Sequence, residues 1–285
     1  MANALMIQGT GSSVGKSLLT TALCRILAQD GWRVAPFKSQ NMSNNAAVTT
    51  DGGEISRAQA AQAQACGIEP TVLMNPVLLK PTTDVGAQVI VLGRPVGTMT
   101  AREYQAFKPQ VQSIIVQALQ ELMRQTDLLI VEGAGSPAEV NLRAHDLANM
   151  WVAKHAGAKV LLVGDIDRGG VFAQLVGTME LLREDERGLV HGFLINKFRG
   201  DLSLLAPGIE WLEARCRQPV MGIIPYLQDV AVAEEDLISP ERHHAQPAKG
   251  PLRIEVVHVP HISNVTDVDA LAREPDVAVQ FVERP

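Results

Sequence analysis

The sequence predicts an α/β protein with a doubly wound, mostly parallel sheet and helices on both of its faces. Short apolar runs alternate with helical patterns along most of the chain, as they do where helices connect parallel strands. The first apolar run leads into a glycine-rich turn that opens a helix, which is the arrangement of a phosphate-binding loop. Polar residues follow several apolar runs, at the strand ends where open α/β sheets bind ligands.

The stretch from Ala4 to Ser17, ALMIQGTGSSVGKS, carries the phosphate-loop (P-loop) pattern and precedes a predicted helix over Lys16–Gln29. Lys16 is expected to reach the β- and γ-phosphates of a nucleotide, and the Ser17 hydroxyl to hold Mg²⁺. The match to G-x-x-x-x-G-K-[ST] is inexact, because Thr10 stands where the motif has glycine. A chance Gly-Lys-Ser is the alternative, and the strand before it and helix after it argue against that. The residues predicted to bind nucleotide here are Gly11, Ser12, Val14, Gly15, Lys16 and Ser17.

Bulk composition sets limits on the class of protein. The chain has 285 residues, 46% of them hydrophobic, so it can bury a large core in one α/β domain or two. Its net charge of −6, with acids and bases interspersed, gives no basic surface for nucleic acid. The apolar runs are too short to cross a bilayer, and the N-terminus has no signal-peptide pattern. Three widely spaced cysteines suit a reduced, cytoplasmic protein in which they pack as small hydrophobes: Cys24, Cys66 and Cys216.

The second predicted strand, Trp32–Phe37, runs into a polar loop over Lys38–Asn45 that has no hydrophobic face. Such a loop either binds a ligand or is simply solvated, and composition alone does not separate the two. Asp51 follows in a glycine-rich turn, where it either coordinates a metal or caps the turn; taken by itself, capping is the favoured interpretation. An alanine- and glutamine-rich helix is predicted over Ser56–Cys66.

The pattern in the middle of the chain predicts two strands outside the main sheet, then a helix and a further strand of the main sheet. Asn75–Lys80 and Gln88–Leu92 have strand patterns, and Tyr104–Arg124 has a clear apolar stripe at helical spacing. Asp127–Val131 is a buried-strand pattern that ends at Glu132 and two nearby glycines. An acid at such a strand tip is the usual second Mg²⁺ contact of a P-loop protein.

A helix is predicted over Asn141–Ala156, with Asp146 in its middle. Because aspartate is a weak helix former, Asp146 is expected either on the solvent face or in a chemical role. The next strand, Lys159–Val163, ends in two acids and an arginine that suit phosphate or carboxylate binding, although Asp167 could equally cap the following helix. These three residues are Asp165, Asp167 and Arg168.

The last strands of the main sheet are predicted over Gly188–Ile195 and Pro219–Ile224, on either side of a helix over Leu202–Cys216. The first of them ends at Asn196, whose amide could read the edge of a base. About six parallel strands are then available, with the candidate sites at their C-terminal tips.

The sequence predicts three regions. Residues 1–238 form the P-loop domain, and residues 239–251 form a proline-rich linker. Residues 252–285, with strand patterns over Leu252–Val259 and Val277–Val282, begin a second α/β domain that stops early. We expect this last stretch to be mobile or badly packed, because it is too short to bury a core of its own.

Seven segments together, in this order and spacing, resemble the cobyric acid synthase family: QGTGSSVGKS, PFKSQNMSNNA, DGGEISRAQAAQA, MNPVLLKP, EGAGSPAEVNL, DIDRGGVFA and INKFRGD. The resemblance runs from residue 4 to about residue 230. RIEVVHVPHISNVTDVDAL is similar to the start of that family's class I glutamine amidotransferase domain. More distantly, the first domain resembles dethiobiotin synthetase, which has a similarly lengthened phosphate loop, and the septum-site and partition ATPases.

The resemblance implies an ATP- and Mg²⁺-dependent ligase of cobalamin biosynthesis. Its substrate would be adenosylcobyrinic acid a,c-diamide, amidated at the b, d, e and g carboxylates through acyl phosphates, with ammonia from glutamine. The implied Mg²⁺ ligands are Ser17, Asp51 and Glu132. The implied catalytic residues are Lys16, Lys38 and Asp146, with Asn196 at adenine. Asp146, Asp165, Asp167 and Arg168 are implied near the corrinoid carboxylate.

Several expectations and alternatives remain open at the level of sequence. No cysteine follows residue 251, so we expect no glutaminase activity and the use of free ammonia, or only ligand binding. A partition-type ATPase switch is disfavoured because Gly11 stands where such proteins carry a second lysine. A sister amidoligase, such as the a,c-diamide synthase or dethiobiotin synthetase, is the other alternative. Neither nucleic acid nor membrane is expected as a partner, and a homo-oligomer is left open.

Overall fold

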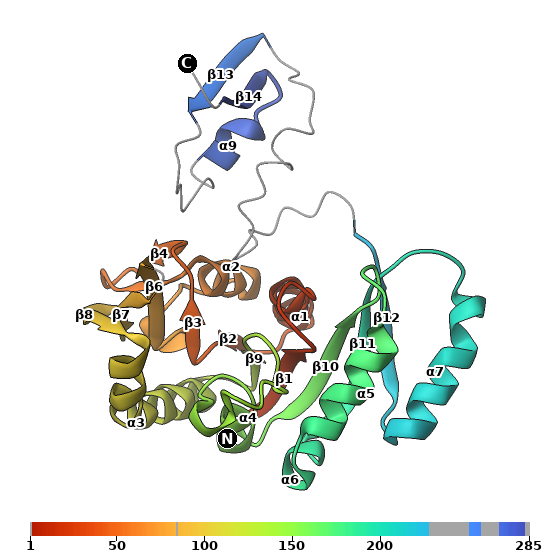
Figure 1. Cartoon of the computed structure of the whole chain (residues 1–285). Coiled ribbons are helices and arrows are strands. Elements are labelled where there is room, and N and C mark those ends of the chain that lie inside the picture. The colour runs from red at the N-terminus through yellow and green to blue at the C-terminus, as the bar shows by residue number, and fades with distance from the viewer. Residues whose placement is uncertain (1, 84, 228–250, 258–267, 283–285) are drawn as a thin grey trace. The chain divides into compact units, whose positions relative to one another are not determined.

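The computed structural model describes residues 2–83, 85–227, 251–257 and 268–282 (Figure 1). Contacts divide the chain into two units, Met1–Val232 and Ala233–Pro285, which are described separately here. Within the described residues, none of the helices has the length and apolar character needed to span a bilayer.

The core of the first unit is a six-stranded sheet in the order β12-β11-β10-β1-β9-β2, with every pairing parallel. The chain moves from β1 to one side of the sheet and later returns to build the other side, which confirms the predicted doubly wound α/β fold. Its strands are β1 (Asn3–Gly9), β2 (Val34–Phe37), β9 (Leu128–Glu132), β10 (Lys159–Asp165), β11 (Val190–Phe198) and β12 (Val220–Pro225).

Helices cover both faces of this sheet because the central strands are apolar on both sides (Figure 1). Ile7 of β1 packs with α1, whereas its neighbour Met6 packs into the larger core on the opposite face. The helices on the first face are α1 (Lys16–Gln29) and α2 (Arg57–Cys66). Those on the other are α3 (Ala101–Gln125), α4 (Met150–Ala156) and α5 (Val171–Leu181), followed by the short α6 (Glu184–Arg187).

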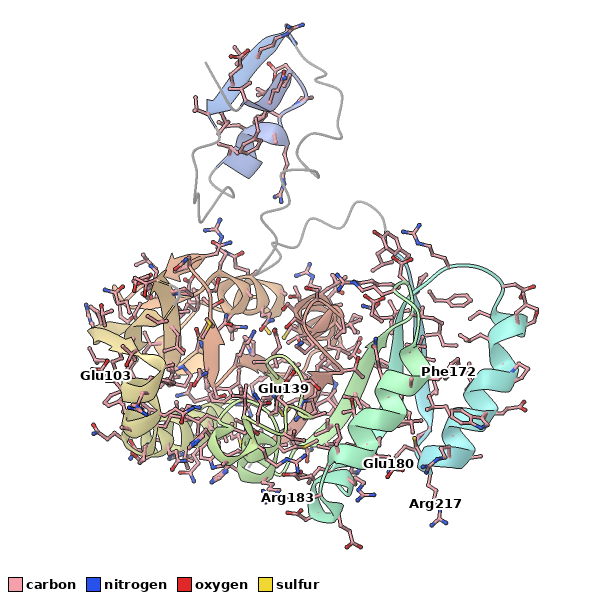
Figure 2. All side chains as sticks on the ribbon, viewed as in Figure 1. Glu103, Glu139, Phe172, Glu180, Arg183 and Arg217 are labelled. Atoms are coloured by element: carbon pink, nitrogen blue, oxygen red, sulfur yellow. The ribbon has the colours of Figure 1, made fainter. Side chains whose placement is uncertain are left out.

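The last helix of the first unit, α7 (Leu202–Cys216), packs against α5. Phe172 lies between the two helices (Figure 2), and its ring meets Trp211 edge-on with centroids 6.5 Å apart. A Cβ added at Gly208 would lie 2.6 Å from the Phe172 ring, so the close approach of the helices requires glycine there.

The strands predicted outside the main sheet lie in a second sheet in the order β3-β6-β7-β8, next to a small hairpin. It corrects one expectation, because the polar loop over Lys38–Asn45 contains β3. Strands β4, β5 and β8 were not predicted. Strand β3 forms without an apolar face because its side chains are satisfied by hydrogen bonds; Tyr104, for example, donates to Gln40 at 2.6 Å. The elements are β3 (Gln40–Met42), β4 (Ala46–Val48), β5 (Glu54–Ser56), η1 (Val72–Met74), β6 (Val77–Thr83), β7 (Gly86–Val91) and β8 (Arg94–Thr100).

The helix predicted over Asn141–Ala156 is wrong for its first half. That half holds only a short 3-10 turn, η2 (Arg143–His145), before α4 begins at Met150. Asp146 has an extended backbone, with φ −63° and ψ 125°, and so lies outside a helix. Its carboxylate captures backbone N–H groups that a continuous helix would have used, which is how aspartate competes with helix formation.

The second unit contains β13 (Leu252–Val257) and β14 (Val277–Val282), paired in parallel, and one helical turn, α9 (Asp269–Ala272). Its identity as the start of an amidotransferase domain stays a prediction. The predicted linker lies outside the described residues, apart from its last residue.

Candidate active site

The phosphate loop lies between the end of β1 and the start of α1. Ser13 and Gly15 both adopt left-handed backbone conformations, with φ of 60° and 98°. Lys16 is buried, and its Nζ donates to Gly11 O at 2.8 Å and to Gly135 O at 3.1 Å. The lysine therefore joins its own loop to the loop that follows β9.

Gly15 is needed for both its backbone and its lack of a side chain. A Cβ built there would lie 2.2 Å from Asn196 Nδ2, and φ of 98° is unfavourable for an L-residue. We expect Gly15→Ala to weaken MgATP binding by about 5- to 150-fold, since such strain costs about 1–3 kcal/mol. Isothermal titration would measure this.

Gly31→Ala is the matched control for that substitution. Gly31 also has a positive φ, 88°, but no atom crowds its missing Cβ. It follows α1 and lies away from the loop. Its variant should lose stability and keep the wild-type affinity for MgATP. Equal affinities for Gly15→Ala and the wild type would contradict the assignment of the loop.

A buried ion pair lies beside the phosphate loop. Strands β2 and β9 are neighbours in register, so Lys38, which follows β2, meets Glu132, the last residue of β9: Lys38 Nζ lies 2.9 Å from Glu132 Oε1. Both side chains are at most 3% exposed. Ser17 Oγ donates to the same carboxylate oxygen at 2.8 Å. Three residues predicted for the site are therefore in contact.

Glu132 is held in its charged form. Burial alone raises the pKa of this carboxyl, but the charge of Lys38 and hydrogen bonds from Lys38, Gln62 and Ser17 together bring the pKa below its usual value. An ionised carboxylate next to a serine hydroxyl offers the oxygen ligands that Mg²⁺ prefers. The residues present thus fit the predicted cation.

A chain of buried amides, which we call the amide relay, ends on Glu132. Gln62 Nε2 donates to Glu132 Oε2 at 2.5 Å, Gln59 donates to Gln62 at 3.4 Å, and Asn41 donates to Gln59 at 3.4 Å. The direction of these hydrogen bonds is set by Glu132, because a carboxylate can only accept. Gln62 therefore turns its NH2 group toward Glu132 and its oxygen toward Gln59, and each further amide donates in the same direction. Sequence analysis missed the relay; two glutamines three apart on an alanine-rich helix were its only signal.

Asp146 acts on the loop that follows β9. Its carboxylate accepts from the backbone N–H of Ala148 and Asn149, each at 2.9 Å, and of Trp151 at 3.0 Å. Asn149 in turn donates to Ala134 O at 2.7 Å and accepts from Ala134 N–H. Asp146 thus fixes the turn that holds this loop, and its predicted catalytic role stays a prediction.

Asp51 lies in an exposed turn and accepts a hydrogen bond from Thr49, which lowers the pKa of its carboxyl. This geometry is that of a turn cap. Asp51 is not among the groups that contact Glu132 in the described part of the chain. Nor do the described residues contain a group of three His, Cys, Asp or Glu side chains able to hold a metal. Asp51 as a third Mg²⁺ ligand therefore stays a prediction.

The residues at the tips of β10 and β11 have different environments. Asp165 is buried and bonds Lys197 at 2.8 Å, whereas Arg168 is exposed and 3.9 Å from Asp165. Asp167 pairs with Arg199 at 3.1 Å near the surface. The alternative role of Asp167 as a helix cap is wrong, because α5 begins after Gly170 with no side-chain cap.

Asn196, predicted at adenine, is buried and donates to Val14 O at 2.8 Å. The structure thus places its amide against the phosphate loop. The contacts of Asn196, Asp165, Asp167 and Arg168 with ligands stay predictions.

The site geometry agrees with a comparison to known families. The model of the CobQ/CobB/MinD/ParA nucleotide binding domain, CbiA, matches residues 5–239. The chain belongs to this nucleotide-binding family. A nucleotide is therefore the ligand that its phosphate loop is built to hold, as the position of Lys16 and Ser17 at the start of α1 also indicates.

Curated relatives of this CbiA-family chain are cobyric acid synthases, so the resemblance found in the motifs is confirmed. The enzyme of Nitratidesulfovibrio vulgaris is 57% identical over 288 residues, covering 99% of this chain and 53% of the relative. That of Sorangium cellulosum is 57% identical over 283 residues, covering 99% and 54%. The chain spans about half the length of the curated relatives it matches.

Solved structures are more distant from this CbiA-family chain. The MinD cell division protein of Aquifex aeolicus has 13% identity and a TM-score of 0.43, covering 79% of this chain and 83% of that one. Chloroplast FtsY of Physcomitrella patens has 17% identity and a TM-score of 0.43, covering 82% and 59%.

Proposed function

We propose that this chain catalyses the ATP-dependent amidation reaction of the cobyric acid synthases. The substrate is adenosylcobyrinic acid a,c-diamide, whose b, d, e and g carboxylates become amides and give adenosylcobyric acid. A carboxylate oxygen is a poor leaving group, so the γ-phosphoryl group of ATP is first transferred to it. Ammonia, normally from glutamine, then displaces phosphate from the acyl phosphate. A reaction that consumes ATP suits a cytoplasmic enzyme.

The observation that carries this proposal is the second cation beside the phosphate loop. Phosphoryl transfer to a carboxylate brings two anions together, so it needs positive charge on both sides of the transferring group. Lys16 comes from the phosphate loop, and Lys38 comes from the end of β2, with Glu132 between Lys38 and Ser17. A partition-type switch carries its second lysine within the phosphate loop, where this chain has Gly11, whereas the second cation here follows β2.

The roles follow from these positions. Lys16 contacts the β- and γ-phosphates, and Lys38 neutralises the phosphoryl group as it moves to the carboxylate. Ser17 and Glu132 hold Mg²⁺, which supplies charge to the phosphate oxygens. The tips of β10 and β11, with Asp167 and Arg168, face the corrinoid, because ligands of such sheets bind at the C-terminal ends of strands.

The test is turnover of ATP by this chain with ammonium chloride, with and without the corrinoid substrate, followed by mass spectrometry. We expect ATP-dependent conversion of hydroxyl to amino groups at the corrinoid carboxylates, visible as stepwise mass changes, and none without ATP. A rate of ATP hydrolysis that is the same with and without the corrinoid would favour a partition-type ATPase switch. Amidation of a different carboxylate substrate in place of this one would identify a sister amidoligase.

A further inference from the structure

Two side chains from the end of β11 hold consecutive carbonyl groups of the phosphate loop. Lys197 Nζ donates to Ser13 O at 2.8 Å, and Asn196 Nδ2 donates to Val14 O at 2.8 Å. We infer that these contacts orient the loop for the phosphates of a nucleotide, with Lys197 as a positioning residue. The inference rests on nucleotide binding by the loop and is independent of the proposed amidation.

The geometry of the peptide unit turns a carbonyl contact into an orienting effect. In a trans peptide the C=O group and the next N–H group point in opposite directions. The Ser13 carbonyl shares its plane with the Val14 N–H, and the Val14 carbonyl shares its plane with the Gly15 N–H. Carbonyls held toward β11 therefore turn both N–H groups away from β11. Oriented N–H groups in a left-handed turn form an anion-binding concavity.

Lys197 is itself held in place. Its Nζ also lies 2.8 Å from Asp165 Oδ2, and Asp165 is only 3% exposed at the end of the neighbouring strand. Strands β10 and β11 pair in register there, so the two side chains start from adjacent strand ends. The backbone of Lys197 has φ of 61°, a conformation that a lysine keeps only where surrounding contacts determine it.

This arrangement gives Asp165 a defined position in the site. Its second oxygen accepts the N–H of Asp167 at 2.9 Å, so both oxygens are engaged inside the protein. The line of contacts runs from Asp165 through Lys197 to the carbonyl of Ser13. Asp165 thus supports the loop through Lys197.

The experiment compares Lys197→Met with the wild-type chain, using isothermal titration with MgATP and with magnesium tripolyphosphate. We expect both ligands to bind about 10- to 100-fold more weakly, which is about 1.4–2.8 kcal/mol at 1.4 kcal/mol for each tenfold. The loss should be equal for the two ligands because the oriented N–H groups contact phosphate alone. Lys197→Arg keeps a cation that can reach both acceptors and should restore most of the affinity.

Lys154→Met is the matched control. Lys154 also forms a partly exposed ion pair, 2.6 Å from Asp185, but lies on α4 and contacts no residue of the loop in the described structure. Its variant should bind both ligands as the wild type does. Unfolding without ligand should show a larger loss of stability for Lys197→Met than for Lys154→Met, because Asp165 is 4% exposed whereas Asp185 is 64% exposed. Binding is therefore measured under conditions in which both variants are fully folded, so that a change of affinity reports on the loop and not on the fold.

Wild-type affinity of Lys197→Met for both ligands would overturn the inference. A loss confined to MgATP would also overturn it, because it would assign the end of β11 to the base. If Lys197→Met does not fold, Asp165→Asn replaces it: that variant keeps the shape of the side chain, removes its charge, and should weaken binding of both ligands by a smaller factor. Unchanged binding by a folded Asp165→Asn would then refute the inference.

Discussion

Replacement of Lys38 by methionine is expected to lower the free energy of unfolding by about 3–5 kcal/mol, the usual cost of breaking a buried ion pair by removing one partner. The reason is the environment of Glu132, which is 1% exposed and would lose the cation 2.9 Å from its carboxylate. Chemical denaturation at neutral pH measures the effect. A loss below about 1 kcal/mol, the value of a surface pair, would contradict the buried geometry.

The same pair sets the dependence of stability on pH. Folding lowers the pKa of Glu132, so its stabilisation is complete above the unfolded value of about 4.3 and is lost as pH falls through the lower folded value. In Lys38→Met, burial still disfavours the charged carboxylate, but the charge of Lys38 no longer offsets this effect. The pKa of Glu132 should therefore rise. The free energy of unfolding of that variant should then fall as pH rises above about 4.3, whereas that of the wild type falls as pH decreases.

A double-mutant cycle with Glu132→Gln separates this interaction from other effects of the substitutions. The double variant has no buried charge left at this position. The single side-chain oxygen of glutamine can accept from Gln62, while its NH2 group can donate to the Ser17 hydroxyl. The double variant should therefore be more stable than the sum of the single losses predicts. Additive losses would mean that the two side chains do not interact.

Replacement of Lys16 by methionine is expected to lower ATP turnover by about 10²–10³-fold, as loss of one oriented donor at a transition state does elsewhere. The effect on stability should be about 1.5–3 kcal/mol, the usual value of hydrogen bonds made by a charged group, because the ammonium of Lys16 donates to the carbonyls of Gly11 and Gly135. The measurement is the rate of phosphate release with the corrinoid and ammonium present.

Lys154→Met again serves as the control and should keep wild-type turnover. A Lys16→Met variant that folds and turns over ATP at a tenth or more of the wild-type rate would refute the role of Lys16 at the phosphates. A fall in affinity for ATP with turnover at saturation unchanged would mean that Lys16 binds the ground state and the transition state equally.

The sequence was sufficient for the main sheet and for the centre of the site. Each strand of that sheet is built around a short apolar run, and buried parallel strands require such runs. Lys16 and Ser17 were found because a phosphate loop is a local motif. Glu132 was found because a charged residue at the end of a buried strand stands out against the apolar residues before it.

What could not be predicted depends on side-chain contacts, most of them between distant segments. Asp146 was placed inside a helix because nothing local shows that its carboxylate binds the N–H of Trp151. Strand β3 was missed because its polar side chains are satisfied from α2 and α3, far along the chain. Lys197 looked like an ordinary charged residue after a strand, and its bond to Ser13 joins residues that only the folded sheet brings together.

The pairing of β1 has a consequence for how the protein is made. Its two neighbours are β9 and β10, and Gly9 at its end pairs with Val163. The ribosome must therefore release about 150 more residues before the first strand acquires both partners, and contacts of such long range are slow to form. Until then β1 has at most one of its two partner strands, and the nucleotide can stabilise the chain only after most of the first unit has been synthesised.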